Sequence, residues 1–257
     1  MGMSPNPVLF VGAGPGDPEL ITVKGQKALQ KADVVIYAGS LVPQELLQWT
    51  RPGSTRLSSA SMNLEEIIAT IATAWSAGKR VVRLHTGDPS LYGAIFEQIV
   101  ELQKRGINYK IIPGVTAAFA AAAALGIEYT LPEVSQTLIL TRMAGRTPVP
   151  RKEDLVALAS HQASMAIYLS ISMVDDVAHI LADAYGADSL CAVVYRASQP
   201  EERIIISRLK GLPAKVKKEK IAKQALIIVG KTLEVDSGNL FYKSKLYDKN
   251  FKHEFRK

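Results

Sequence analysis

VLFVGAGPGDPELITVKGQKAL, residues 8–29, begins as an apolar run, turns at Gly12, Gly14 and Gly16, and continues with the apolar spacing of a helix. A buried strand that enters a helix through a glycine-rich turn is the first half of a βαβ unit. Such units build parallel sheets that helices cover. The stretch therefore predicts an α/β fold, and it raises the question of whether the glycines hold a nucleotide phosphate.

The same alternation continues along the chain. We predict further strands at 33–40, 79–88, 108–114, 135–143, 164–172, 190–198, 202–209 and 224–233, and helices at 19–32, 63–78, 90–106, 116–126, 152–161, 174–186 and 214–222. A Gly/Pro-punctuated helical stretch from Gly114 to Pro132 could join two domains. We expect two α/β domains with mostly parallel sheets, at 1–114 and 115–238, followed by a basic tail at 239–257.

Composition limits the class of protein. Hydrophobic residues make up 47% of the 257 residues and charged residues 21%, as in ordinary globular proteins. No apolar run approaches the ~20 residues that a membrane helix needs, and the N-terminal residues show no signal-peptide pattern. The single cysteine, Cys191, lies in an apolar run and is interpreted as a buried structural thiol. We therefore expect a cytoplasmic protein without membrane association.

The positive charge is concentrated near the C-terminus. The net charge is +7, with seven Lys/Arg and one Glu in residues 208–223 and six Lys/Arg and two acids in residues 239–257. The simpler interpretation is a solvated helix face and a polar tail. The alternative is attraction of a polyanion, either nucleic acid or a polycarboxylate.

The first loop does not match a dinucleotide site. That fingerprint needs a glycine three residues after Gly14, where this chain has Asp17. Pro15 removes a backbone donor, and a carboxylate at the helix entrance caps the amides itself and repels phosphate. The glycines still require a tight strand-to-helix turn, with the backbone close to another group, and turn formation alone is the simpler interpretation.

Several other loops at predicted strand ends form a specific series with the first. VGAGPGDPELIT is followed by TGDPSLYG, PGVTAA, YRASQPEERI and ALIIVG, and this series resembles the tetrapyrrole (corrin/porphyrin) methylase family over nearly the whole chain. VIYAGSLVPQELL, LHTGDPSLYGAIFEQ and LTRMAGRTPVPRKEDLVALASH resemble one branch, which methylates carbon-11 of precorrin-4 or cobalt-precorrin-4 in cobalamin synthesis.

The resemblance implies S-adenosylmethionine (SAM) as methyl donor, a homodimer, and an active-site trough between the two domains. In the family SAM is held mainly by loops other than the first, whose glycines would shape the trough floor. Thr86 departs from the family's glycine, and Leu169 stands where many relatives carry methionine, so main-chain contacts are expected there. Carried over onto this sequence, the implied SAM contacts are Pro15, Tyr37, His85, Thr86, Gly87, Asp88, Leu91, Thr116, Ala117, Tyr168, Leu169, Arg196, Ala197 and Ala225.

The expected chemistry is methyl transfer from sulfonium to a nucleophilic ring carbon, in which the protein mainly aligns the reactants. Asp17, Asp88 and Tyr92 are candidates to assist loss of a ring proton, although both aspartates could equally be loop caps. Arg142 and Arg146 are candidates for the substrate carboxylates. The histidines and Cys191 show no metal-ligand spacing, so no protein-bound metal is expected, and any cobalt would belong to the substrate.

Other functions remain open at this level. They are a methylase of another precorrin or of uroporphyrinogen III, a ribosomal-RNA methyltransferase of the same fold, a non-enzymatic RNA-binding module, and a nicotinamide oxidoreductase. We expect no nucleic-acid partner, because the first loop lacks the GTPIGNL-like pattern of the RNA-modifying branch. The sequence leaves open whether the substrate carries cobalt.

Overall fold

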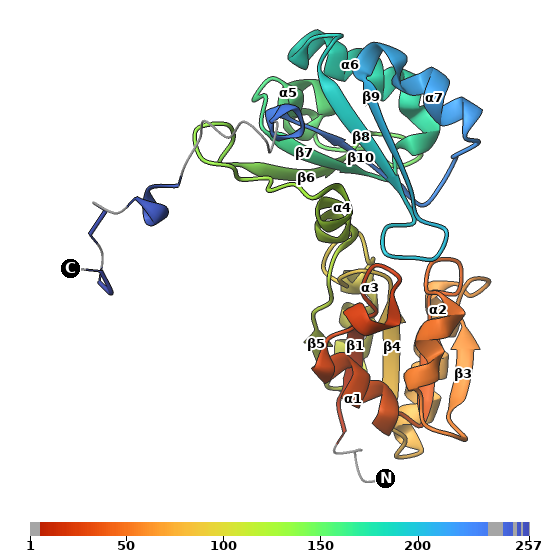
Figure 1. Ribbon diagram of the computed structural model, residues 1–257. Helices are drawn as coiled ribbons and strands as arrows, with labels where there is room; N and C mark the ends of the chain where they lie inside the picture. The colour runs from red at the N-terminus through yellow and green to blue at the C-terminus, as the bar shows by residue number, and fades with distance from the viewer. Residues whose placement is uncertain (1–5, 236–243, 249–250, 253, 257) are drawn as a thin grey trace. The chain divides into compact units, whose positions relative to one another are not determined.

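The structure is a computed structural model that describes residues 6–235, 244–248, 251–252 and 254–256. The chain divides into two compact units (Figure 1). The first comprises Met1–Ala120 with Ser198–Pro200, and the second comprises Ala121–Ala197 with Glu201–Lys257. Of the expected tail at 239–257, the structure describes residues 244–248, 251–252 and 254–256, which include a short 3-10 helix, η8 (Lys245–Tyr247).

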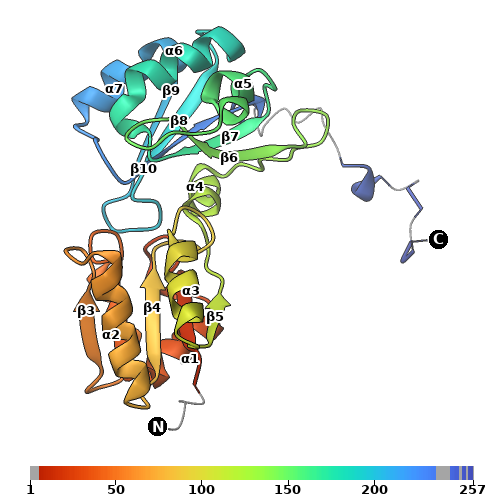
Figure 2. The ribbon, with the colours of Figure 1, turned by 180° about the vertical axis from the view of Figure 1, so that it is seen from behind.

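The first unit is a parallel sheet between two layers of helices. Its strand order is β3-β2-β4-β1-β5, and every neighbouring pair is parallel. Figures 1 and 2 show its two faces, one covered by α1 and the other by α2 and α3. Residues of η2 pack into the same core as α1. The elements are β1 (Val8–Gly12), η1 (Pro18–Leu20), α1 (Val23–Lys31), β2 (Val34–Tyr37), η2 (Gln44–Trp49), β3 (Thr55–Ser58), α2 (Leu64–Ser76), β4 (Val81–His85), α3 (Ile95–Lys104) and β5 (Tyr109–Ile112).

This arrangement places one set of loops at one edge. All five strands run in the same direction, so the loops that follow them share the edge at their carboxyl ends. In open α/β sheets this edge is where ligands bind. The next element, α4 (Ala117–Leu125), starts just after this edge and continues into the second unit.

The second unit is a five-stranded sheet with helices on one face. The order is β6-β7-β10-β8-β9. Helices α5, α6 and α7 lie on that face (Figure 1). Their apolar side chains share one core with alternate residues of the strands. The elements are β6 (Leu138–Arg142), η3 (Arg151–Glu153), α5 (Leu155–Ala159), β7 (Ser164–Tyr168), η4 (Ile171–Met173), α6 (Val174–Tyr185), β8 (Leu190–Tyr195), β9 (Arg203–Arg208), η5 (Leu209–Gly211), α7 (Leu212–Lys218), β10 (Ala225–Val229) and η6 (Lys231–Glu234).

The prediction of mostly parallel sheets holds for the first unit and is wrong for the second. Only β6 and β7 pair in parallel, and the other three pairs are antiparallel. For the pair β8 and β9 the cause is their direct connection through residues 196–202, which contain no helix. A parallel pair needs a crossover of about a dozen residues, whereas an antiparallel pair can be joined by a short loop.

Candidate functional site

Three glycines from three strand-end loops meet at the edge of the first sheet. A Cβ atom on Gly12 would lie 2.6 Å from both the Cα of Gly114 and the carbonyl oxygen of Gly87, and one on Gly114 would lie 2.2 Å from that oxygen. Real Cβ atoms essentially never come so close, so only glycine fits at these two positions. The backbones after β1, β4 and β5 therefore touch directly.

The backbone groups of the first loop are already used in this junction. The N–H of Gly14 donates to the carbonyl of Gly87 at 3.2 Å, and the N–H of Gly87 donates back to Gly14 at 2.8 Å. The N–H of Ala13 donates to the carbonyl of His85 at 2.7 Å. A phosphate would need such N–H groups free. The glycines thus serve backbone packing between loops, as the sequence interpretation expected.

Asp88 ties two of these loops together. One carboxylate oxygen accepts from the backbone N–H of Ser90 at 2.8 Å and from the Ser90 hydroxyl, and the other accepts from the N–H of Gly114 at 2.9 Å. Partial burial alone would raise the pKa of this carboxyl, but these hydrogen bonds outweigh it and lower the pKa. The oxygens of the Asp88 carboxylate are therefore already used as hydrogen-bond acceptors, and its lowered pKa makes it a weak general base.

Asp88 caps its own loop through Ser90 and does not cap the helix that follows. The helix that follows, α3, begins only at Ile95, and its N-cap residue is Ala94, which makes no side-chain cap. Tyr92 and Ala94 adopt left-handed backbone angles, with φ of 56° and 46°. The helix predicted from residue 90 starts late because the chain turns through these two residues first.

Asp17 caps the short helix after the glycine turn, as the sequence predicted. Its carboxylate accepts from the N–H of Glu19 at 2.8 Å, and its own N–H donates to the hydroxyl of Ser198 at 3.1 Å. Within the first unit, the side-chain amide of Gln199 donates to the carbonyl of Pro15 at 3.1 Å. The contact holds the buried Pro15 in place, and nothing in the sequence patterns singled out Gln199 for it.

His85 ends β4 directly before the loop that starts at Thr86. It is 4% exposed and stacks on Phe10, with ring centroids 5.9 Å apart. Burial, helped by the nearby guanidinium of Arg83, lowers the pKa of His85 to about 3. Its Nε2 atom is buried without a hydrogen-bond partner among the described residues. His85 is thus neutral at physiological pH and lies beneath the loop.

Four other predicted positions lie along the same edge of the first unit. Tyr37 ends β2, and the N–H of the next residue donates to the carbonyl of Leu84 on β4 at 3.2 Å. Leu91 is half-buried in the loop after β4. Thr116 is buried and precedes Ala117, the first residue of α4. The first-unit positions implied by the resemblance therefore follow β1, β2, β4 and β5.

The remaining predicted contacts share one edge of the second sheet. Arg142 pairs in register with Tyr168, and Tyr195 pairs with Ala225, so the ends of β6, β7 and β8 lie beside the start of β10. Ala197, two residues after β8, is buried. Sequence reasoning placed these residues in separate loops, and the sheet register brings them to one edge.

Left-handed backbone angles cluster at this edge. Leu169 and Arg196, the residues after β7 and β8, have φ of 55° and 48°, and Gln224, before β10, has φ of 55°. Arg196 donates to Gln224 from both its N–H and its Nε, each at 2.9 Å. Leu169 remains 65% exposed despite its apolar side chain. Strained backbone persists only where its surroundings over-determine it, and it clusters at ligand sites.

The two candidate substrate arginines differ in environment. Arg142 donates from its guanidinium to the carbonyls of Thr147 and Pro148 at 3.1 and 2.7 Å, so it braces its own loop. Arg146 lies exposed on that loop, and no interaction with another part of the described chain engages it. The sequence treated the two alike, because it does not show which guanidinium the loop itself uses.

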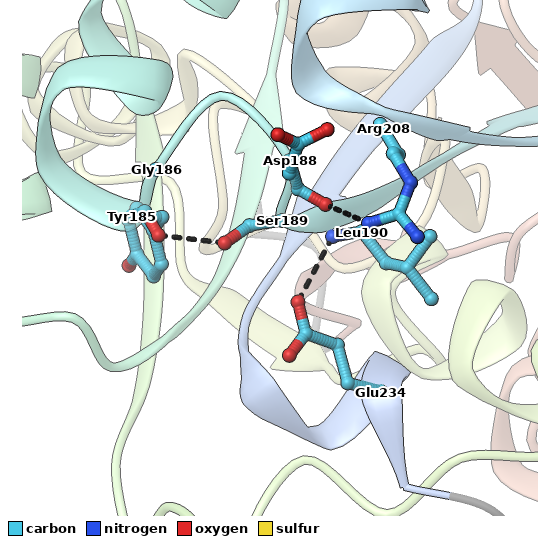
Figure 3. A pocket seen from close by; sticks show the side chains of 7 residues that line it. All are labelled: Tyr185, Gly186, Asp188, Ser189, Leu190, Arg208 and Glu234. Carbon is cyan, nitrogen blue, oxygen red and sulfur yellow. Dashed lines mark hydrogen bonds between the residues drawn. The ribbon is translucent and has the colours of Figure 1, made fainter.

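A hollow of about 540 Å³ lies elsewhere (Figure 3). It is at the opposite end of the second sheet, beside Leu190 at the start of β8 and Arg208 at the end of β9. Its polar groups bond to each other: Glu234 accepts from the N–H of Leu190 at 3.1 Å, and Arg208 donates to the carbonyl of Asp188 at 2.5 Å. None of the predicted site residues lines it, so it is not the candidate site.

Other chemistries find little support in the described part of the chain. No group of three or more His, Cys, Asp or Glu side chains there could hold a metal ion. Burial raises the pKa of Cys191 to about 12, which makes this thiol a poor nucleophile. None of the helices described is both long and apolar enough to cross a membrane.

The fold and the strand-end loops correspond to a known class of protein. The family model of the tetrapyrrole (corrin/porphyrin) methylases matches residues 7–213, which is most of the chain. The chain therefore belongs to this family of methyltransferases, and the resemblance noted in the sequence is confirmed.

Individual relatives give a more specific comparison than the family model does. The cobalt-precorrin-4 C(11)-methyltransferase of Methanocaldococcus jannaschii is 57% identical over 251 residues, covering 97% of this chain and 96% of that protein. The X-ray structure of a cobalamin biosynthetic enzyme, cobalt precorrin-4 methyltransferase, is similar with a TM-score of 0.86 and 48% identity, covering 88% of this chain and 95% of that one. Uroporphyrin-III C-methyl transferase from Thermus thermophilus, complexed with S-adenyl homocysteine, matches with a TM-score of 0.70 and 26% identity, covering 91% and 97%.

Proposed function

We propose that this chain is a SAM-dependent methyltransferase of cobalamin biosynthesis that methylates carbon-11 of precorrin-4 or cobalt-precorrin-4. The observation that carries the proposal is the 57% identity, over almost the full length of both chains, to a methyltransferase named for that carbon. The similar enzyme with bound S-adenyl homocysteine, the product that SAM leaves, supports SAM as the donor. A cytoplasmic homodimer completes the proposal and rests on the resemblance alone.

We assign SAM binding to the loops that end the strands in each unit. In the first unit these are the loop from Thr86 to Leu91 and the start of α4, with Pro15, Tyr37 and His85 beside them. In the second unit they are the residues around Tyr168, Arg196 and Ala225. The support is that each set lies at one sheet edge, and that strained backbone marks that edge in the second unit.

The reaction makes few demands on side-chain chemistry. A bond forms between the methyl carbon and the ring carbon while the bond from sulfur to that methyl breaks, and its electron pair stays on sulfur. The sulfonium becomes a neutral thioether, and the positive charge passes to the ring, which can lose a proton. Alignment of carbon, methyl and sulfur lowers such a barrier by several kcal/mol. Rigid loops at a sheet edge suit that task.

The structure bears on the candidate proton acceptors. Asp17 caps η1 and Asp88 bridges two loops, so each has a structural use for its carboxylate. Tyr92 is 43% exposed on the loop after β4 and stays a candidate. Arg146 is the better candidate of the two arginines for a substrate carboxylate, because Arg142 is already engaged.

The test is product analysis with defined substrates. The enzyme is incubated with precorrin-4, cobalt-precorrin-4 or uroporphyrinogen III, each with SAM carrying an isotopically labelled methyl group. Mass spectrometry counts the added methyl groups, and NMR locates the label. We expect one methyl group at carbon-11 of a precorrin-4 substrate. A label at another carbon, or turnover of uroporphyrinogen III alone, would overturn the assignment. Sedimentation of the purified protein tests the homodimer separately.

A further inference from the structure

Two buried polar side chains beneath the loop 86–94 have no role in the function proposed above. Arg83 lies on β4, the strand that precedes the loop, and Gln98 lies on α3, the helix that follows it. Each is only 5% exposed. Buried polar groups are costly unless they are hydrogen-bonded, so their partners indicate what they hold in place.

The two side chains form a continuous chain of hydrogen bonds. Arg83 donates from Nη1 to the carbonyl of Ile36 on β2 at 3.2 Å and from Nε to Oε1 of Gln98 at 3.1 Å. Gln98 in turn donates from Nε2 to the carbonyl of Ala94 at 3.1 Å. A guanidinium can only donate and a carbonyl can only accept, so these two partners fix the orientation of the Gln98 amide, with its oxygen toward Arg83 and its nitrogen toward Ala94.

The residue at the end of this chain is one that needs support. Ala94 has a φ of 46° and Tyr92 one of 56°, a region that side chains with a Cβ disfavour. Ala94 also begins α3 without a side-chain cap. Asp88 anchors the amino-terminal part of the loop to Gly114, and Gln98 anchors its carboxyl-terminal end.

We propose that Gln98, oriented by Arg83, is a positioning residue of the SAM site. It holds the end of the loop 86–94 in its left-handed conformation, and this presents Thr86–Leu91 to the cofactor. The inference rests on the proposed function, since it takes this loop to contact SAM. Gln98 itself does not contact the cofactor.

The test measures S-adenosylhomocysteine binding by calorimetry in Gln98→Leu and in the matched control Gln103→Leu, which alters an exposed residue of the same helix. Loss of the hydrogen bonds and of the loop geometry should raise the Kd of Gln98→Leu about tenfold. Gln103→Leu should bind as wild type does. The KM for the tetrapyrrole at saturating SAM should stay near the wild-type value in both variants, because the change concerns the cofactor loop alone.

A rescue variant separates positioning from stability. Glycine adopts positive φ without strain, so Ala94→Gly in the Gln98→Leu background should restore most of the affinity. Gln98→Glu keeps an acceptor for Arg83 but cannot donate to Ala94, and it should also weaken binding. Wild-type affinity in a folded Gln98→Leu or Gln98→Glu variant, or no rescue by Ala94→Gly, would overturn the inference. Absence of binding by the wild-type protein would instead overturn the proposed function.

Discussion

At the scale of single residues, His85 gives the folded chain a defined response to acid. Its pKa is about 3 when folded, against 6.5 for an ordinary histidine, so between these values the unfolded chain binds about one more proton. Stability should therefore rise with pH across this window, and fall as pH decreases, with a contribution of at most about 1.4 kcal/mol per pH unit. Replacing His85 by Phe should remove that contribution, as measured by urea unfolding at a series of pH values.

The control for this prediction is another histidine. His161 is exposed, so His161→Phe should leave the pH dependence of wild type unchanged. If His85→Phe and wild type lose stability in parallel below neutral pH, then the imidazole is not held neutral in the folded state.

Asp88 acts through three hydrogen bonds rather than through proton transfer. Asp88→Ala leaves the N–H groups of Ser90 and Gly114 without their acceptor, so we expect a loss of about 1–2 kcal/mol in unfolding free energy and weaker S-adenosylhomocysteine binding. Because the pKa of Asp88 is lowered, its stabilisation is present above the pKa of an unfolded aspartate and is lost as pH falls through the lower folded value. A chemical role as general base would instead show in Asp88→Asn as a lost rate with unchanged cofactor affinity.

At the scale of elements, the loop after β6 distinguishes its two arginines. Arg146→Lys should raise the KM for the tetrapyrrole and leave SAM affinity unchanged, because lysine does not reproduce the two parallel hydrogen bonds of a guanidinium to a carboxylate. Arg142→Lys should loosen the loop, whose carbonyls at Thr147 and Pro148 it holds, and so increase proteolytic cleavage there. Steady-state assays and limited proteolysis of both variants check this. Wild-type kinetics in Arg146→Lys would place that residue outside the substrate site.

Local sequence signals predicted a helix well where nearby side chains accept hydrogen bonds from the free backbone N–H groups at its start. Asn63 and Glu66 form the capping box that starts α2 at Leu64, next to the start predicted at residue 63. The start of α3 was missed because the chain first passes through two left-handed residues, Tyr92 and Ala94, which the apolar spacing does not reveal. The edge strand β3 was also missed, since the short run Thr55–Ser58 is largely exposed and carries no apolar period.

Strand direction and the use of each site residue depend on contacts distant in sequence. The seven residues between β8 and β9 already implied an antiparallel pair, but the position of β10 between β7 and β8 could not be predicted from periodicity. Motif resemblance singled out the strand-end loops that we propose to bind SAM, whereas the glycine contacts at Gly12 and Gly114 required the sheet order that brings β1 between β4 and β5. Arg83 and Gln98 gave no signal, because a buried polar pair is defined by its partners.

At the scale of the whole molecule, the donor should act as a stabilising ligand. A ligand that binds only the folded chain stabilises it by about 2.7 kcal/mol at a concentration of one hundred times its Kd. For a chain of 257 residues, each kcal/mol corresponds to roughly 2–4 °C in Tm, so S-adenosylhomocysteine should raise the Tm by roughly 5–10 °C. NAD should cause no shift, because the N–H groups of Gly14 and Gly87 that a dinucleotide phosphate would need are bonded to each other's loops. Calorimetric scans with each compound check this. A shift with NAD and none with S-adenosylhomocysteine would return the glycine turn to a phosphate-binding role.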